Sequence, residues 1–289
     1  MKTTTKNKPK IHHLTLRGLS LLPILAAWTS AQASTLAWYR MEGTAGDVIS
    51  SVANSSGTAA GATASDTTIQ YGSSVAGSHI YDPVSGTTVA NTSSMAFNGT
   101  TTDAFLTVTD GSTSGPFDVA DFTVEMFVKI DTVLTNNRPF VSHGGGIDSG
   151  WNVRSVEFSS DQYASGTISG ANVFNSNKPV IDDGEWHHLA FVVQTSTSGS
   201  EYARLYMDGD LVREKTTGLD TYVPNVSADF LIYGGDYVGF SDEVRFSNTA
   251  LDSSDFLVAI PEPGTLTLFG VGIAAAILAA RRNSKQNNS

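Results

Sequence analysis

The chain has 289 residues, with 27 glycines, no cysteine and 40% hydrophobic residues. This apolar content suffices for a folded core, and the absence of cysteine excludes disulfides, thiolate metal sites and cysteine nucleophiles. All 28 acidic residues lie between Glu42 and Glu262, and the body from Ser34 to Glu262 contains only nine of the 17 basic residues, so this body carries a net charge of −19. A body this acidic repels phosphate backbones, which argues against nucleic acid as a partner.

The first 33 residues have the organisation of a secretory signal peptide. Five basic residues precede an apolar run from Leu19 to Trp28. This run is too short for a membrane span, which requires about 20 apolar residues. The small residues Ala31 and Ala33 stand at the positions that precede signal-peptide cleavage. We therefore predict that residues 1–33 are a signal peptide cleaved after Ala33 and that the rest of the chain is exported.

Residues 34–259 are predicted to form one β-domain. The segment LAWYRMEG reads as a first strand, but residues 50–94 are rich in Ser, Thr, Ala and Gly. We expect this stretch to be a long surface excursion between the first and second strands, with an interdomain linker as the alternative. In FTVEMFVKI (122–130), apolar residues alternate with Thr123, Glu125 and Lys129. This period of two predicts a half-buried strand whose polar face meets solvent.

The later part of the body continues the β pattern. WHHLAFVVQ (Trp186–Gln194) predicts a mostly buried strand, and ARLYMDGDLVRE predicts a hairpin that turns at Asp208-Gly209. The only helix candidate in the body is the short segment SNTALDSSDFL. Because no alternation of strands with helices occurs, the sequence predicts an all-β, antiparallel β-sandwich.

The end of the chain has the parts of a sorting tail. They are, in order, Pro261-Glu262-Pro263, an uncharged run from Thr265 to Ala280, and the pair Arg281-Arg282. Proline keeps the tripeptide extended, and basic residues hold the end of an apolar segment on the cytoplasmic side. We predict residues 260–289 to be a sorting and anchor segment with a hydrophobic helix; an ordinary carboxy-terminal membrane anchor is the alternative.

This tail resembles the PEP-CTERM sorting signal of Gram-negative bacteria. The resemblance implies transient anchoring in the inner membrane, processing by an exosortase, and delivery to the cell surface or extracellular matrix.

The body resembles the laminin G-like, concanavalin A-like family. The segments that carry the resemblance are LAWYRMEG, SSMAFNGTTTDAFLTV, FTVEMFVKI, GEWHHLAFVV, RLYMDGDLV and FSDEVRFSNTALDSSDF. The resemblance implies a jelly-roll sandwich that binds glycans or proteins, often with structural calcium. In the resembled family the first loop and the closing strand share an ion, so Glu42, Asp47 and Asp242 are the candidate calcium ligands. The alternative is that these acids are solvated surface groups.

Known catalytic patterns are missing from the sequence. It contains no H-E-x-x-H motif, no phosphate-binding loop and no dinucleotide fingerprint. Glu157 and Asp161 are four residues apart, but Ser159 stands where a jelly-roll glycosidase would carry a further acid. His187 and His188 point to opposite faces of a strand and cannot easily share a metal, so we expect one of them to be buried with a hydrogen-bonded ring.

Sugar rings stack on exposed aromatic side chains, and four aromatic residues stand in loop-like sequence: Trp151, Tyr163, Tyr222 and Tyr237. Each is equally compatible with a core position, so no glycan site is selected among them. The sequence as a whole indicates a non-enzymatic, exported protein that binds extracellular polysaccharide or a surface protein. The alternatives are a purely structural matrix component and a divergent glycoside hydrolase.

Overall fold

The structure is a computed structural model, and its described residues are 34–65, 67–99, 104–109, 115–133, 139–146, 149–158, 161–174, 180–195, 200–219, 222, 228–233 and 237–261. Within these ranges the chain forms 19 β-strands and one short 3-10 helix. The predicted signal peptide, with Ala31 and Ala33, and the predicted sorting helix lie outside them. Among the described residues no helix is long and apolar enough to cross a membrane.

The first sheet has eight strands, all paired antiparallel. Seven follow one another in the order β16 (Asp210–Lys215), β15 (Tyr202–Met207), β14 (Trp186–Gln194), β9 (Phe122–Val133), β18 (Tyr237–Ser247), β7 (Ser94–Asn98) and β4 (Gln70–Gly72), and β1 (Thr35–Tyr39) also pairs with β18. The turn between β15 and β16 has left-handed φ angles of 55° at Asp208 and 82° at Gly209. This is the geometry of a tight hairpin, so the predicted Asp208-Gly209 turn is confirmed.

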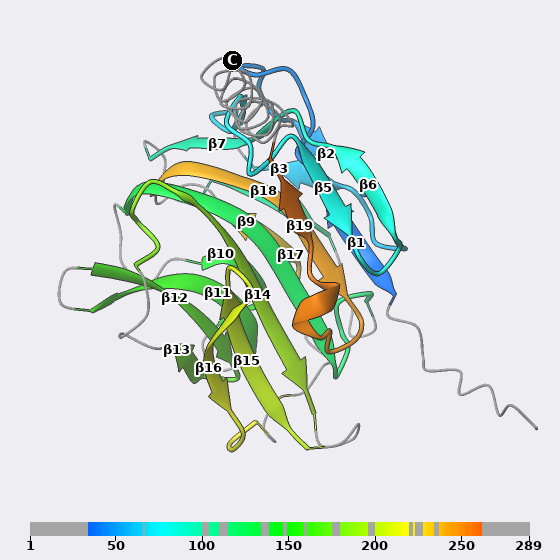
Figure 1. The fold of residues 1–289 in the computed structure, drawn as a ribbon, viewed down its shortest axis with the longest axis vertical. Helices are drawn as coiled ribbons and strands as arrows, with labels where there is room; N and C mark the ends of the chain where they lie inside the picture. Colours follow the sequence, from blue (N-terminus) through cyan, green and yellow to red (C-terminus); the bar gives the residue numbers. More distant parts are fainter. Residues whose placement is uncertain are drawn as a thin grey trace, which may run out of the picture. The chain divides into compact units, whose positions relative to one another are not determined.

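The second sheet also has eight antiparallel strands. Their order is β13 (Ala171–Phe174), β12 (Asp161–Ile168), β11 (Ser149–Phe158), β10 (Pro139–Gly146), β17 (Phe230–Tyr233), β8 (Phe105–Val108), β3 (Ala62–Ala64) and β2 (Ser51–Val52). The two sheets pack face to face, as Figure 1 shows for β9 and β14 over β10 to β12. The predicted all-β antiparallel sandwich is therefore confirmed.

Aromatic side chains fill the space between the two sheets. Phe122 of β9 lies 5.0 Å from the ring of Trp151 of β11, and Trp151 stacks on Phe246 of β18 at 5.7 Å. Phe117 stacks on Phe230 of β17 at 4.5 Å. Stacked and edge-to-face contacts of this kind add to the free energy gained by burying the rings. This core joins residues that are more than 100 positions apart in the sequence.

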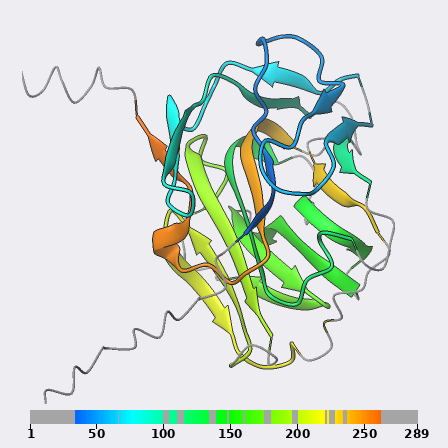
Figure 2. The same cartoon turned by 90° about the vertical axis from the view of Figure 1, so that its right-hand side faces the viewer.

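A third, small sheet lies on the outer side of the first sheet (Figures 1 and 2). It consists of β19 (Val258–Ile260), β5 (His79–Asp82) and β6 (Thr87–Ala90), in that order. Beneath it, Ile80 and Leu257 form a buried apolar cluster with Trp38 of β1 and Phe127 of β9. The 3-10 helix Ser253–Asp255 leads into β19.

This third layer corrects two of our predictions. Strand β9 is not half buried, because Thr123 and Glu125 on its predicted solvent face are 0% and 1% exposed beneath the added layer. Residues 50–94 are neither a linker nor one surface loop: they supply β2 and β3 to the second sheet, β4 to the first, and β5 and β6 to the third. A sequence rich in small residues can form such short strands because their side chains need little space to pack.

Candidate functional site

Two adjacent carboxylates are buried at a β-bulge in β18. The register of β18 against β9 shifts after Asp242, and Glu243 has a left-handed φ of 53°. Such a bulge re-aims side chains of the bulged strand. Glu243 accepts hydrogen bonds from the indole of Trp38 and from Nε of Arg40, the latter at 3.3 Å, and Asp242 accepts one from Nδ2 of Asn91 at 2.8 Å. Both carboxylates are 0% exposed.

The surroundings of these two acids disfavour their charged forms. Burial raises the pKa of Asp242 well above its ordinary value, and the charge of Glu243 raises it further. Burial raises the pKa of Glu243 to about 8, although the guanidinium of Arg40 opposes this shift. The nearby Glu42 raises the pKa of both. A cation bound among these three carboxylates would reverse these shifts, because it favours the ionised form.

Unpartnered oxygens at the same place are the ligand type that calcium prefers. Within the part of the chain that the structure describes, Oδ1 of Asp242 and Oδ1 of Asn91 are both buried without a hydrogen-bond partner. Leaving a buried acceptor unpaired costs about 1–3 kcal/mol. Calcium binds six to eight oxygens from carboxylates, amides and backbone carbonyls. Asp242 and Asn91 therefore supply oxygens of the kind that calcium prefers, and no local pattern in the sequence pointed to Asn91.

The predicted calcium ligands are not all brought together. Glu42 is held by Nη2 of Arg40 at 3.1 Å and by the backbone N–H of Thr92 at 3.1 Å, close enough to Asp242 to raise its pKa. Asp47 is exposed in a turn whose backbone pairs with Tyr71. Among the residues that the structure describes, no group of three or more acidic or histidine side chains is placed to hold a metal ion.

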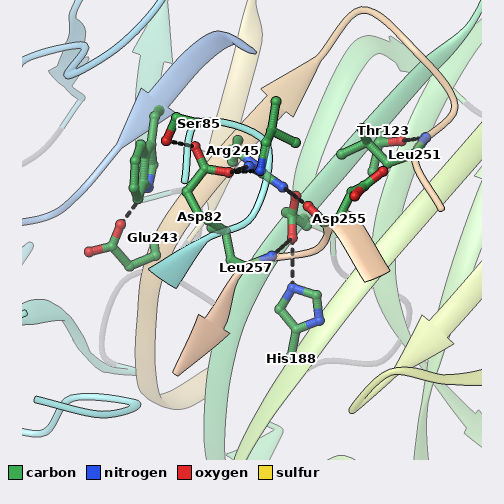
Figure 3. A network of polar contacts seen from close by, with 12 residues as sticks. Asp82, Ser85, Thr123, His188, Glu243, Arg245, Leu251, Asp255 and Leu257 are labelled. Carbon is green, nitrogen blue, oxygen red and sulfur yellow. Dashed lines mark hydrogen bonds and ion pairs between the residues drawn. The ribbon is translucent and has the colours of Figure 1, made fainter. Parts of the chain in front are cut away.

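A second buried network joins the first sheet to the third (Figure 3). Arg245 of β18 donates to the carboxylates of Glu125 and Asp82 and, at 2.7 Å, to the carbonyl of Asp255. Burial alone would raise the pKa of Glu125, but Arg245 and the hydrogen bond from His188 lower it below its ordinary value. Every charged group is thus paired, which buried ions require.

The two adjacent histidines are both buried, whereas the sequence led us to expect one. They lie on opposite faces of β14, as predicted. Nε2 of His188 lies 2.9 Å from Glu125 in the network just described. The ring of His187 lies between two carboxylates, with Nδ1 at 2.8 Å from Asp208 and Nε2 at 3.1 Å from Asp183. These contacts hold the start of β14 against the turn that follows β15 and against the segment that precedes β14.

The outer face of the second sheet carries a polar group of side chains. Asn152 and Arg154 of β11 alternate with Trp151 and Val153, which belong to the core. Because successive side chains of a strand point to opposite faces, Asn152 and Arg154 lie on the outer face. Both are half-buried there.

Neighbouring strands complete this group, which we name the β11–β13 polar face: Asn152, Arg154, Thr167 and Asn172. The register places Thr167 beside Asn152, and Asn172 beside Thr167. Oδ1 of Asn172 accepts hydrogen bonds from Nη2 of Arg154 at 2.8 Å and from Oγ1 of Thr167 at 3.0 Å. Both Nε of Arg154 and Oδ1 of Asn152 are buried, and neither has a hydrogen-bond partner among the described residues. Asn172 is the exposed member of the face.

Other sequence candidates occupy different places. Trp151, Tyr222 and Tyr237 are buried in the hydrophobic core between the sheets, so they are not stacking surfaces. Tyr163 is 8% exposed but precedes the core residue Ala164 in β12, so its side chain lies on the outer face of the second sheet. Glu157 and Asp161 do not share a strand: they lie in β11 and β12, on either side of the turn that joins them. Pro261 is exposed directly after β19, while Glu262, Pro263, Arg281 and Arg282 lie outside the described residues.

Comparison with known families agrees with this geometry. The family model of the concanavalin A-like lectin/glucanases superfamily matches residues 98–255, more than half of the chain. The chain belongs to this superfamily. A model of the PEP-CTERM protein-sorting motif matches residues 259–283 and indicates export by the exosortase system of Gram-negative bacteria. No curated protein matches the chain.

Several solved structures are similar to the chain at low sequence identity. Domain 4 of an extracellular arabinanase from Geobacillus stearothermophilus, in complex with arabinotriose, has a TM-score of 0.53 at 18% identity over 78% of this chain and 97% of that one. The binding domain of a paraclostridial mosquitocidal protein has a TM-score of 0.49 at 12% identity, over 76% of this chain and 50% of that one. A sialidase of Trypanosoma rangeli has a TM-score of 0.49 at 14% identity, over 78% of this chain and 32% of that one. The similarity to the arabinanase domain shows the fold alone.

Proposed function

We propose that this protein is an exported component of the cell surface or extracellular matrix that binds polysaccharide without enzymatic activity. The observation that carries the proposal is the β11–β13 polar face, where the half-buried Arg154 and Asn152 lie beside the exposed Asn172. Sugar hydroxyls both donate and accept hydrogen bonds, so they complement guanidinium and amide groups on such a face. The arabinanase domain of similar fold, which was solved with arabinotriose, supports an oligosaccharide as ligand.

The test is polysaccharide binding by the purified protein, with the exopolysaccharide of the producing strain included among the ligands. Arg154→Gln should weaken binding about tenfold or more, because a hydrogen bond to a charged group contributes about 1.5–3 kcal/mol. Arg213→Gln on the exposed edge strand β16 is the matched control and should bind like the wild type. Equal weakening by both variants would remove the β11–β13 polar face as the site.

Calcium is the second element of the proposal. We propose that Asp242, Asn91 and Glu42 hold a structural calcium ion, which would fix the loop that contains Glu42 against β18. Binding in calcium and in chelator should therefore differ only as far as the fold loosens without the ion. A folded protein that binds no polysaccharide in either condition would favour the structural matrix role. Release of reducing sugar that Glu157→Gln abolishes would instead establish a glycoside hydrolase.

A further inference from the structure

The β5–β6 hairpin from the Ser- and Thr-rich segment pairs with the last described strand of the chain. In β19, Val258 is opposite Tyr81, Ala259 opposite Ile80, and Ile260 opposite His79. Figure 2 shows β19 in orange beside this cyan hairpin. The hairpin therefore ties the sequence around position 80 to the sequence around position 259, and β19 forms one edge of the small sheet.

Buried charges hold the chain just before β19. The backbone N–H of Leu257 donates to Oε2 of Glu125 at 2.7 Å, and the carbonyl of Asp255 accepts from Arg245 at 2.7 Å. Arg245 also binds Asp82, the last residue of β5 (Figure 3). One network therefore fixes both the hairpin and the segment that enters β19, and hydrogen bonds to charged groups are among the stronger ones in proteins.

Close packing holds β19 itself. Ala259 packs inward against the cluster that contains Trp38 and Ile80. Gly77 stands two residues before β5 and lies close to the end of β19. A Cβ added at position 77 would stand 2.8 Å from the carbonyl oxygen of Ile260. Ser78 adds a hydrogen bond to the same oxygen at 3.4 Å. The absence of a side chain at position 77 is thus a condition for this close approach.

The Pro-Glu-Pro tripeptide begins where this contact ends, while the matched sorting motif starts at Ala259 within β19. Pro261, the first residue of the tripeptide, is exposed and follows Ile260 without a spacer. Only residues 261–264 separate β19 from the uncharged run that starts at Thr265. Four extended residues span at most about 14 Å. A folded domain that keeps β19 in place therefore stays within that distance of the apolar part of its tail.

We propose that the β5–β6 hairpin binds β19 by strand pairing. The hairpin thereby lets the folded domain present the sorting motif, and β19 remains the last ordered strand after processing. The processing enzyme then meets the exposed Pro261 as the first residue beyond the strand. Residues up to Ile260 are protected by strand pairing. This inference gives the Ser- and Thr-rich segment a role in export that is independent of ligand binding at the β11–β13 polar face.

The experiment expresses the full chain in a Gram-negative host that has an exosortase. The carboxy-terminus of the surface protein is determined by mass spectrometry, and hydrogen exchange of the β19 amides is measured on the purified product. Gly77→Val is the test variant, because its side chain would collide with the backbone of Ile260. Gly86→Asn is the control, since position 86 lies in the turn of the same hairpin with open space around it and has a φ of 68°, which asparagine tolerates.

The wild type and Gly86→Asn should end at or beyond Ile260 and show slow exchange in β19. In Gly77→Val, exchange of these amides should be at least about tenfold faster, and the product should be trimmed into or before β19. Retained polysaccharide binding, or an unchanged unfolding midpoint if no ligand is found, shows that Gly77→Val remains folded. A wild-type product that ends before Val258, or identical ends and exchange rates in all three proteins, would overturn the proposal.

Discussion

Replacing Arg245 by methionine tests how far the third layer depends on buried charge. Arg245 is 0% exposed and is shared by Glu125 and Asp82, which are 1% and 3% exposed. Methionine fills much of the same volume but cannot donate hydrogen bonds. The substitution would therefore leave two carboxylates buried without their cation, and the carbonyl of Asp255 would lose its donor.

The expected loss is large on the scale of domain stability. Breaking a buried ion pair by removing one partner costs about 3–5 kcal/mol. For a domain of this size each kcal/mol lowers the unfolding midpoint by about 2–4 °C, so the midpoint should fall by about 6–20 °C. Arg204→Met is the matched control, because Arg204 pairs with Glu214 at 2.5 Å on a partly exposed edge. Such a surface pair contributes at most about 1 kcal/mol.

Thermal unfolding of the two variants and the wild type, followed by circular dichroism at pH 7, measures this difference. A third protein, Arg245→Met combined with Glu125→Gln and Asp82→Asn, should regain part of the loss because neutral amides replace the unpaired carboxylates. If Arg245→Met is no less stable than Arg204→Met, the network does not stabilise the fold and the reasoning from buried charge is wrong.

Three more outcomes are expected. The raised pKa of Asp242 means that its ionised form is unfavourable in the folded state. Asp242→Asn should therefore raise the unfolding midpoint in chelator at pH 7 and abolish any stabilisation by calcium. A calcium response equal to that of the wild type would contradict the proposed site. Burial would lower the pKa of His187, but its hydrogen bonds to Asp208 and Asp183 raise it above 6.5. The resulting stabilisation is complete below pH 6.5 and is lost as the pH rises through the raised pKa. The difference in unfolding free energy between wild type and His187→Gln, measured by denaturant titration, should therefore shrink as the pH rises. A difference that stays constant with pH would show that the charge of His187 does not contribute to stability. Gly166→Val should cost about 1–3 kcal/mol or more by the same titration, because a Cβ there would stand 2.3 Å from the ring of Phe191; a fully stable variant would show that this part of the core can adjust.

Local sequence patterns were sufficient to predict the elements whose formation depends on neighbouring residues. The alternation in β9 and the Asp208-Gly209 turn predicted a strand and a hairpin that the structure contains. Periodicity predicts an extended strand because side chains point alternately to its two faces, and a tight turn needs residues that tolerate positive φ. The same patterns did not show that Glu125 is buried, since a polar residue on an alternating strand normally meets solvent.

The candidate sites depended on contacts between distant parts of the chain. Asn91 meets Asp242 across 151 positions, and Arg245 meets Asp82 across 163. No local pattern encodes such pairs, because each arises only when the third sheet packs on the first. Side-chain period, turn chemistry and a short linear motif were enough to predict the β class, the sandwich and the PEP-CTERM sorting motif. Which acids are buried, which polar groups remain unpaired and which strand precedes Pro261 became known only from the fold, because burial and pairing are properties of the packed chain.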